Sequence, residues 1–404
     1  ASCDDKQVAY LAPTEILTNQ HFQTFCKFLQ SFNLTIALAT GSENKIFDSE
    51  LCDSYEVKKP ELLKRINNGQ INIVIGTHAI IQDGVKFSNL GLVIIDEQHR
   101  FGVAQRATLL KNNENVPDSK FQIPHLLSMT ATPIPRTLML TVYGDLDISI
   151  INEMPKNRKK IITQIVPTKD RKKSYDFIRQ EIKNGRQAFV VCPRIENTTE
   201  ISQPIANSTD IKAVKEEHRK LSEEIFPNLK IAMLHGKLKP KEKEKIMADF
   251  KNNKTDILVA TSVIEVGIDV PNATIMLIEE SDRFGLAQLH QFRGRIGRGQ
   301  HQSYCLLATN SEDKSNCERL KALVNSENGF QIAEYDLELR GPGQFLGERQ
   351  WGMPDMAFAS FADVFLLQKV RDYASDLLNN DPELTKHPAL KNRVINNQSK
   401  IHLE

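Results

Sequence analysis

The stretch Leu92-Val-Ile-Ile-Asp-Glu-Gln-His99 decides how this 404-residue sequence folds. Its first four residues are all apolar, which is typical of a strand covered on both faces, as the strands of parallel sheets are. Two carboxylates, Asp96 and Glu97, follow directly. Because open parallel sheets bind their ligands beyond the carboxyl ends of their strands, this stretch predicts both an α/β fold and the place of a functional site.

Similar apolar runs lie on either side of this strand, at Val8–Ala12, Thr35–Thr40, Ile71–Ile75 and His125–Met129. Helical stretches separate them, and this alternation predicts a parallel sheet with helices on both faces. Each run ends in small or polar residues. We therefore expect the carboxyl ends of these strands to form one ligand-binding edge.

The same pattern starts again in the second half, with strands expected at Ala188–Cys192, Lys230–Leu234, Ile257–Ala260, Ile275–Ile278 and Ser303–Ala308. Before it, residues 155–186 contain eleven Lys or Arg against three acids, interrupted by the apolar run Ile161–Val166. We interpret the start of this stretch as an interdomain connection and its charges as a solvated surface. After Thr309 the pattern is helical, with one Gly-rich interruption from Arg340 to Gly352. The sequence thus predicts two tandem α/β domains, 1–154 and 155–310, and a helical tail, 311–404.

The composition excludes several classes of protein. Hydrophobic residues make up 40% and charged residues 25% of the chain, so a disordered chain or a coiled coil is excluded. The net charge of +1 argues neither for nor against a nucleic-acid or membrane partner. No apolar run approaches the roughly 18 residues that span a bilayer, so we expect no membrane partner. The six cysteines form no CxxC pair and no zinc-ligand spacing, which indicates reduced thiols in a cytoplasm.

The carboxylate pair suits nucleotide hydrolysis. Asp96 can hold Mg²⁺ through its water shell beside nucleotide phosphates, and Glu97 can orient and deprotonate the attacking water. The next apolar run closes with Ser128-Met-Thr-Ala-Thr-Pro133, which brings the hydroxyls of Thr130 and Thr132 to the same edge. A helix cap is the alternative for this second stretch, but the order and spacing of the two stretches favour a nucleotide site.

An arginine cluster in the second domain suits the same chemistry. Arg293, Arg295 and Arg298 lie within six residues, and no acid occurs between Arg283 and Arg298. Arginine stabilises the charge on a phosphoryl group in transit; a clamp on nucleic-acid phosphates is the alternative. Upstream, a strand ends at Thr261, and the following turn offers groups for nucleic-acid phosphates and for a ribose.

Taken in order, these stretches resemble the motifs of superfamily 2 helicases: Ala12-Pro-Thr-Glu15 (motif Ia), Thr40-Gly-Ser42 (Ib), Ile75-Gly-Thr-His78 (a DNA-contact loop), Asp96-Glu-Gln-His99 (II), Thr130-Ala-Thr132 (III), Cys192-Pro-Arg194 (IV), Thr261–Asp269 (V), and Gln291 with Arg295 and Arg298 (VI). Within that superfamily, Asp96-Glu-Gln-His-Arg-Phe-Gly102 and Gly341-Pro-Gly343 most resemble RecG-type DNA translocases. The family resemblance implies two RecA-like lobes followed by a helical hairpin and a coupling loop. It also implies an ATP-dependent helicase that remodels stalled replication forks and Holliday junctions in repair and recombination.

The resemblance also implies roles for individual residues. It implies ATP and Mg²⁺ as cofactors, branched double-stranded DNA as the partner, and a monomer. The residues implied in hydrolysis are Glu97, Arg295, Arg298 and Gln291; in nucleotide or metal binding, Asp96, Gly267, Asp269, Thr130 and Thr132; and in DNA contact or coupling, Pro13, Thr14, Thr40, Gly41, Thr77, His78, Thr261, Arg340, Arg349 and Gln350.

One motif of the family does not occur. The P-loop string G-x-x-x-x-G-K-[ST], which cradles nucleotide phosphates, is absent, and only residues 1–7 precede the first strand. We therefore expect the family's P-loop segment and wedge domain to lie outside this chain, and the chain alone to bind ATP·Mg²⁺ poorly. We also expect the first sheet to lack the P-loop strand that the family places inside it, leaving an exposed apolar edge.

Other functions stay open on these residues. One alternative is a protein that binds DNA but does not hydrolyse ATP, because the P-loop string is missing. A transcription-repair coupling translocase is similar but tends toward Glu at the position of Gln98. An RNA helicase is disfavoured because Asp96-Glu-Gln-His99 departs from Asp-Glu-Ala-Asp, and a transporter ATPase because the α/β lobe is repeated.

Overall fold

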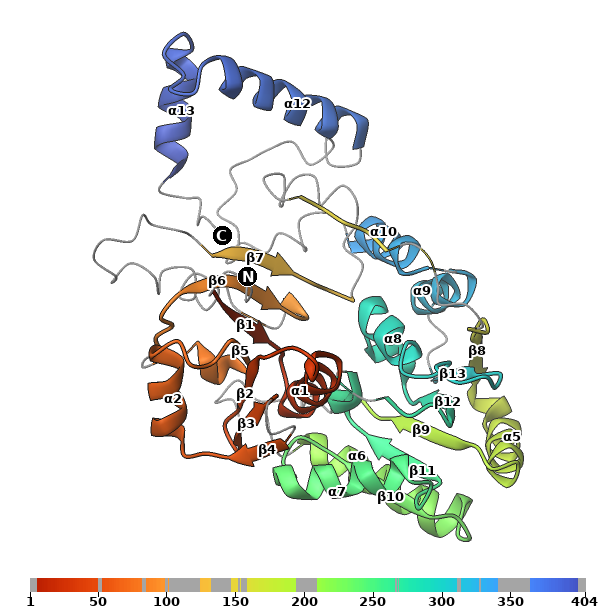
Figure 1. The fold of residues 1–404 in the computed structure, drawn as a ribbon. Helices are drawn as coiled ribbons and strands as arrows, with labels where there is room; N and C mark the ends of the chain where they lie inside the picture. Colours follow the sequence, from red (N-terminus) through yellow and green to blue (C-terminus); the bar gives the residue numbers. More distant parts are fainter. Residues whose placement is uncertain are drawn as a thin grey trace. The chain divides into compact units, whose positions relative to one another are not determined.

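The computed structural model describes residues 6–49, 53–81, 85–98, 101, 124–131, 147–151, 153, 158–193, 209–265, 267, 269–310, 314–326, 328–340 and 364–398. The chain forms two compact units. One comprises residues 1–131, 159–283 and 291–310 and holds both β-sheets; the other comprises residues 132–158, 284–290 and 311–404 and holds the C-terminal helices (Figure 1).

The first sheet has seven described strands in the order β4-β3-β2-β5-β1-β6-β7. Their bounds are β1 Gln7–Leu11, β2 Thr35–Ala39, β3 Asn44–Asp48, β4 Asp53–Glu56, β5 Ile73–Gly76, β6 Leu90–Ile95 and β7 His125–Ser128. Strands β2, β5, β1, β6 and β7 are parallel neighbours. These are the five strands predicted from the apolar runs, so the expected parallel core is confirmed.

Strands β3 and β4 are additions that the apolar runs did not predict. β3 pairs antiparallel with β2 and with β4. Their sequences, Asn44-Lys-Ile-Phe-Asp48 and Asp53-Ser-Tyr-Glu56, contain few apolar residues, and all four residues of β4 are exposed. An exposed strand at a sheet edge has no buried face to demand apolar side chains, so its sequence resembles that of a loop.

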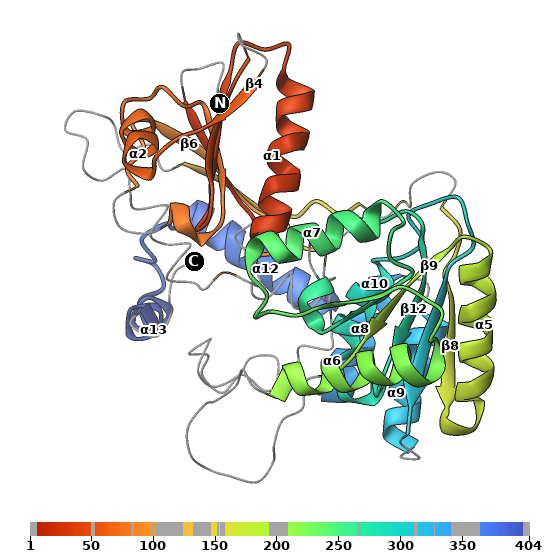
Figure 2. The ribbon, with the colours of Figure 1, turned by 90° about the horizontal axis from the view of Figure 1, so that it is seen from below.

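Helices α1 (Glu15–Leu29) and α2 (Lys59–Asn67) cover opposite faces of this sheet (Figure 2). Phe22 of α1 packs into a core that includes Tyr10, whereas Leu62 of α2 packs into a core that includes Leu11. Adjacent residues of β1 thus face different helices, as the two-residue period of a strand requires. The side chain of Thr14 caps α1 by accepting a hydrogen bond from the Leu17 N–H at 3.3 Å.

The apolar edge expected beside a missing P-loop strand stays a prediction; among the described strands, β7 ends the sheet and carries exposed apolar side chains. The described strands pair without interruption from β4 to β7, and β7 is the last strand of the order. Its leucines Leu126 and Leu127 are 37% and 48% exposed. The uncovered apolar surface is therefore at one end of the sheet and not between described strands.

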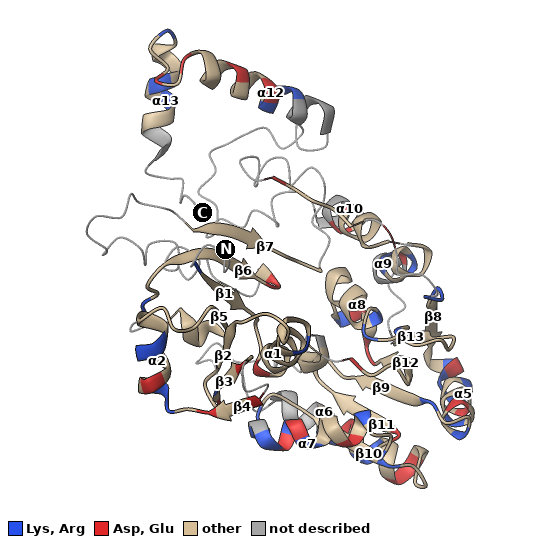
Figure 3. Cartoon of the chain, viewed as in Figure 1, with Lys and Arg blue, Asp and Glu red and all other residues tan. Residues whose placement is uncertain are grey.

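The second sheet has six described strands in the order β10-β11-β9-β12-β13-β8, and every pair of neighbours is parallel. The bounds are β8 Ile162–Pro167, β9 Gln187–Val191, β10 Ile231–Leu234, β11 Ile257–Ala260, β12 Ala273–Ile278 and β13 Tyr304–Thr309. Its helices are α5 Arg171–Lys183, α6 Thr209–Arg219 and α7 Pro240–Lys251, and α8 Leu286–Arg293 begins in the other unit and ends in this one. Helices such as α5 and α7 carry both signs of charge, whereas most strands are uncharged (Figure 3). The predicted α/β fold, with parallel sheets flanked by helices, is thus confirmed.

The basic stretch 155–186 belongs to this sheet from residue 162 onward. Its apolar interruption forms β8, and its next residues form α5. Ile178 of α5 is fully buried in the same core as Leu221. On the other face, Phe250 of α7 packs against Phe189 with ring centroids 5.1 Å apart. The interpretation as a solvated surface holds for much of α5 but is wrong for Arg171, which is partly buried against Glu279.

The tail is helical, as predicted. It comprises α9 Lys314–Asn325, α10 Gly329–Arg340, α12 Val364–Asn380 and α13 Pro388–Gln398, and α9 packs against α10. Arg340 is the last residue of α10, whereas Arg349 and Gln350 lie outside the described residues. Among the helices that the structure describes, none combines the length and the apolar character needed to cross a bilayer.

Candidate functional site

Four of the segments predicted to contact ligands meet at the carboxyl edge of the first sheet. The four strands that precede them, β2, β5, β1 and β6, are parallel neighbours. Backbone hydrogen bonds continue the ladder past the strand ends: Ala12 N–H donates to Gly76 at 2.9 Å, and Asp96 N–H donates to Leu11 at 2.9 Å. Parallel strands end at the same edge, so residues that are distant in sequence become neighbours here.

The threonines at this edge stabilise the loops. The Thr40 hydroxyl donates to the Glu43 carbonyl at 3.0 Å, and Thr77 caps a short 3₁₀ turn, His78–Ile80. Both threonines are buried. By contrast, Gly41 and His78 are exposed, and Pro13 and Thr14 are half-buried. The exposed positions are the ones that a ligand can reach.

Glu15, the first residue of α1, joins two of these segments. Its carboxylate accepts hydrogen bonds from the Ser42 N–H at 3.1 Å and from the Ser42 hydroxyl at 2.9 Å. Both residues belong to the motif strings quoted from the sequence, but their pairing has no local signal because 27 residues separate them. The contact holds the first turn of α1 against the loop after β2.

The acid pair after β6 occupies two different environments. Asp96 is partly exposed, whereas Glu97 is 6% exposed and has a left-handed backbone with φ of 51°. A non-glycine residue in that region costs free energy and persists where the surrounding structure holds it, often at functional sites. One oxygen of Glu97 accepts a hydrogen bond from the Ala131 N–H at 3.4 Å.

The segment after β7 contacts the acid pair and its neighbour Gln98 through Ser128, Met129 and Ala131. The Ser128 hydroxyl donates to the Gln98 side chain, and the Gln98 N–H donates to the Met129 carbonyl at 3.2 Å. Thr130 is exposed at this edge, and Thr132 lies outside the described residues. The two segments are therefore joined as expected, with Ser128 and the Ala131 N–H making the contacts described here.

His21 and Tyr10, which no sequence motif singled out, lie beside Asp96. His21 Nε2 is 3.2 Å from Asp96 Oδ2 and 3.4 Å from the Tyr10 hydroxyl. Burial, with a smaller contribution from the Asp96 carboxylate, raises the pKa of Tyr10, so the phenol stays neutral. The available signal was a histidine two helical turns after the Thr14 cap, which is weak evidence by itself.

The donor set suits Mg²⁺ bound together with a nucleotide. The described residues contain no group of three or more His, Cys, Asp or Glu side chains that could hold a metal ion alone. Mg²⁺ commonly takes one or two carboxylates, several waters and substrate phosphates. A single, partly exposed carboxylate such as Asp96 at a sheet edge fits that mode of binding.

In the second sheet, two of the predicted residues pair with each other. Arg298 Nη1 lies 3.2 Å from Asp269 Oδ1, and Arg298 Nε donates to the Gly294 carbonyl at 3.3 Å. Gly267 has φ of 82°, a conformation suited to glycine. Thr261, directly after β11, is buried. The structure therefore joins the predicted motif V and motif VI segments through an ion pair at the surface.

The other motif VI residues differ in accessibility. Gln291 is buried, and its side-chain oxygen has no hydrogen-bond partner among the described residues. Arg293 is also buried, and burial lowers its pKa. Arg295 is half-buried, and Arg298 is exposed. Arg295 and Arg298, the two arginines assigned to phosphate, are thus more accessible than Arg293.

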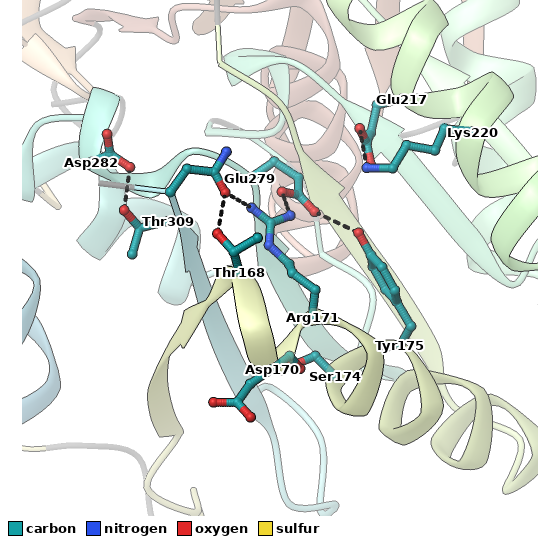
Figure 4. Close-up of polar contacts among 11 residues, drawn as sticks. Thr168, Asp170, Arg171, Ser174, Tyr175, Glu217, Lys220, Glu279, Asp282 and Thr309 are labelled. Atoms are coloured by element: carbon teal, nitrogen blue, oxygen red, sulfur yellow. Dashed lines mark hydrogen bonds and ion pairs between the residues drawn. The ribbon is translucent and has the colours of Figure 1, made fainter. Parts of the chain in front are cut away.

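A second polar cluster lies at the carboxyl edge of the second sheet and was not predicted (Figure 4). Arg171 donates to the buried Glu279 carboxylate, and the Tyr175 hydroxyl lies 3.5 Å from it. The cluster lines a cavity of about 410 Å³ that also includes Cys192 and Lys220. Burial raises the pKa of Glu279, although the Arg171 charge opposes this rise. The sequence carries a signal, because Leu277-Ile-Glu-Glu280 repeats the strand-then-acid-pair pattern of the first sheet.

Three family models match parts of this chain. Residues 1–141 match the family model described as DEAD/DEAH box helicase, and residues 171–300 match the helicase conserved C-terminal domain. Residues 326–401 match the model described as ATP-dependent DNA helicase RecG, domain 3, C-terminal.

Individual relatives cover nearly the whole chain. The chain is 47% identical over 396 residues to the ATP-dependent DNA helicase RecG of Synechocystis sp., covering 98% of this chain and 44% of that protein. It is 44% identical to the Aquifex aeolicus protein of the same name, covering 96% of this chain and 47% of that protein. A solved structure of RecG bound to a three-way DNA junction is 40% identical, with a TM-score of 0.64, and the match covers 90% of this chain and 44% of that one. The chain thus spans a little under half the length of these relatives.

Proposed function

We propose that this chain, which is homologous to the RecG-type ATP-dependent DNA helicases of superfamily 2, forms the motor part of an ATP-driven double-stranded DNA translocase. Its substrates would be branched DNA, such as replication forks and Holliday junctions, in repair and recombination. The solved relative bound to a three-way DNA junction supports this choice of substrate. We further expect the motor to act as a monomer in the cytoplasm.

The observation that best supports the proposal is the convergence of motif segments on one sheet edge. The acid pair after β6 lies beside the segments after β1, β5 and β2, and Glu15 joins two of them. A site with metal-binding chemistry at one strand end and accessible loops at the neighbouring ends can hold a nucleotide and DNA at the same edge.

Each proposed role follows from the chemistry of the side chain. Asp96 would hold Mg²⁺ through its water shell, and the ion would neutralise phosphate charge when bound. Glu97, held by the Ala131 N–H, would orient the attacking water. Arg295 and Arg298 would contact the γ-phosphate, and Asp269 would hold Arg298 until phosphate is present.

The remaining residues would complete the nucleotide site or contact DNA. Gln291, Gly267, Thr130 and Thr132 are proposed for the nucleotide and its water network. Pro13, Thr14, Gly41 and His78 are proposed for DNA contact because they are accessible, whereas Thr40, Thr77 and Thr261 would shape the loops. Arg340, Arg349 and Gln350 would couple hydrolysis to movement.

The test is DNA-stimulated phosphate release in wild type and in Glu97→Gln, at an ATP concentration high enough to offset the weak ATP·Mg²⁺ binding expected of this chain. We expect Glu97→Gln to lower the rate at least about 100-fold, since a positioned general base typically contributes that much, and to leave junction binding unchanged. Glu280→Gln is the matched control. Glu280 also follows a strand and an acid, and it also has a left-handed backbone, with φ of 44°.

A second function, DNA binding without hydrolysis, is favoured by one observation: the sequence contains no P-loop string. A gel shift with a Holliday junction and a linear duplex, with and without ATP, separates the two functions. Junction binding without any phosphate release would support the second function. If the chain neither binds junctions nor releases phosphate, both proposals are wrong.

A further inference from the structure

Three side chains from three elements meet at the carboxyl edge of the first sheet. Tyr10 belongs to β1, His21 belongs to α1, and Asp96 follows β6. His21 Nε2 lies 3.2 Å from Asp96 Oδ2, and the rings of His21 and Tyr10 are 4.8 Å apart between centroids. The His21 and Asp96 side chains are 25% and 20% exposed, and Tyr10 is buried beneath them.

The direction of the hydrogen bond follows from the chemistry of the partners. An ionised carboxylate only accepts hydrogen bonds, so His21 Nε2 must carry the hydrogen that it donates to Asp96. The neutral Tyr10 hydroxyl oxygen lies 3.4 Å from the same nitrogen and is a second, weaker acceptor. The imidazole is therefore held between an aromatic ring and the carboxylate.

Helix α1 connects this contact to the proposed DNA-contact residues. His21 lies seven residues after the Thr14 cap, which is roughly 10 Å along a helix and nearly two full turns. Positions seven apart lie on the same helix face. The first turn of α1 also holds the loop after β2 through Glu15 and Ser42.

We infer that His21 is a positioning residue for Asp96: its Nε2–H holds the carboxylate in one orientation for Mg²⁺ and links that carboxylate, through α1, to the segment proposed to contact DNA. This inference rests on the proposed function, because it takes Asp96 as the metal-binding residue. Mutation of a residue that hydrogen-bonds to a metal-binding carboxylate typically lowers metal affinity by 10- to 100-fold.

Two substitutions at His21 separate the hydrogen bond from ring packing. His21→Phe keeps an aromatic ring against Tyr10 but removes the donor. His21→Gln loses the ring but keeps an N–H at a similar distance from the backbone. If His21 acts only by packing, His21→Phe should behave as wild type and His21→Gln should not; a donor role predicts the reverse.

The measurement is Mn²⁺ binding in the presence of ADP, followed by water-proton relaxation enhancement, which does not depend on turnover. The relevant signal is the part of Mn²⁺ binding that is lost in Asp96→Asn. We expect His21→Phe to weaken this part about 10-fold and His21→Gln to change it by less than threefold. His218→Phe is the matched control, because His218 Nε2 contacts the Ile231 carbonyl at 3.2 Å, outside the proposed site. Its binding should equal that of wild type.

A second readout concerns His21 itself. In ¹⁵N-histidine spectra of the metal-free chain, the signal lost in His21→Phe should show a protonated Nε2 and should shift in Asp96→Asn. If Asp96→Asn binds Mn²⁺ as well as wild type, the proposed metal role of Asp96 is wrong. If Asp96→Asn loses binding while His21→Phe keeps it, only the inference about His21 is overturned.

Discussion

At the scale of single residues, two acid pairs with the same local sequence occupy opposite environments. Asp96 is partly exposed and contacts His21, whereas Glu279 is buried and paired with Arg171. Their successors differ as well: Glu97 is buried, and Glu280 forms an exposed ion pair with Arg283 at 2.9 Å. The pattern of a strand followed by two acids therefore predicts a polar strand end, and the neighbouring elements decide whether the first acid is accessible or buried in an ion pair.

The pH dependence of stability should report the burial of Glu279. Burial raises the pKa of Glu279 above its ordinary value of 4.5, so the folded protein holds this proton to higher pH than the unfolded chain does. Stability from this group is therefore greatest at low pH and is lost as pH rises through its folded pKa. Glu279→Gln should remove this loss.

The measurement is the free energy of unfolding in urea for wild type and Glu279→Gln, from about pH 4.5 upward. Wild type should lose stability relative to Glu279→Gln as pH rises. A difference that stays constant, or that grows in the opposite direction, would show that Arg171 outweighs burial at this carboxylate.

At the scale of elements, the five parallel strands of the first sheet were predicted from apolar runs, and the two antiparallel strands β3 and β4 were not. Buried parallel strands need apolar residues on both faces, so they are visible in the sequence. The register between them is not visible, and it is the register that brings Leu11 beside Gly76 and Ile95. It therefore decides which strand-end segments become neighbours.

Gly76 should be required for the close approach of β5 to β2. A Cβ atom at this position would lie 2.4 Å from the Ala39 carbonyl oxygen and 2.9 Å from Ile80. Gly76→Ala should therefore destabilise the fold by roughly 1–3 kcal/mol, the usual range for overpacking a core. It should also displace the loop that carries His78.

Urea unfolding followed by circular dichroism tests this, with Gly236→Ala as the control. A Cβ atom at Gly236 meets nothing within 4 Å, so its substitution should stay within about 0.5 kcal/mol of wild type. Equal stability of the two variants would mean that β2 can shift without cost.

At the scale of the whole molecule, near-neutral charge and the exposed apolar strand at the end of the described sheet favour weak association, at high concentration, of the monomer proposed as the working form. The net charge is +1, which provides little repulsion between copies. Strand β7 ends the described sheet and exposes Leu126 and Leu127. Unpaired apolar edges are common sites of intermolecular strand pairing, and a lysine there opposes it.

Leu127→Lys should reduce self-association more than the same substitution elsewhere. Leu378 in α12 is the matched control, because it is 49% exposed against 48% for Leu127 and lies on a helix. Static light scattering over a concentration series should show less association for Leu127→Lys than for Leu378→Lys. Similar curves for both variants would indicate that added charge, and not the strand edge, controls association.

The sequence by itself determined the parallel sheets, the helical tail and the acid pair at a strand end, because these depend on patterns within a few residues. Only the tertiary structure decided that His21 contacts Asp96 across 75 residues and that Arg171 contacts Glu279 across 108. No local pattern encodes such pairs. They arise because parallel strands separated by helices end at a shared edge, and the strand order then sets which distant side chains meet there.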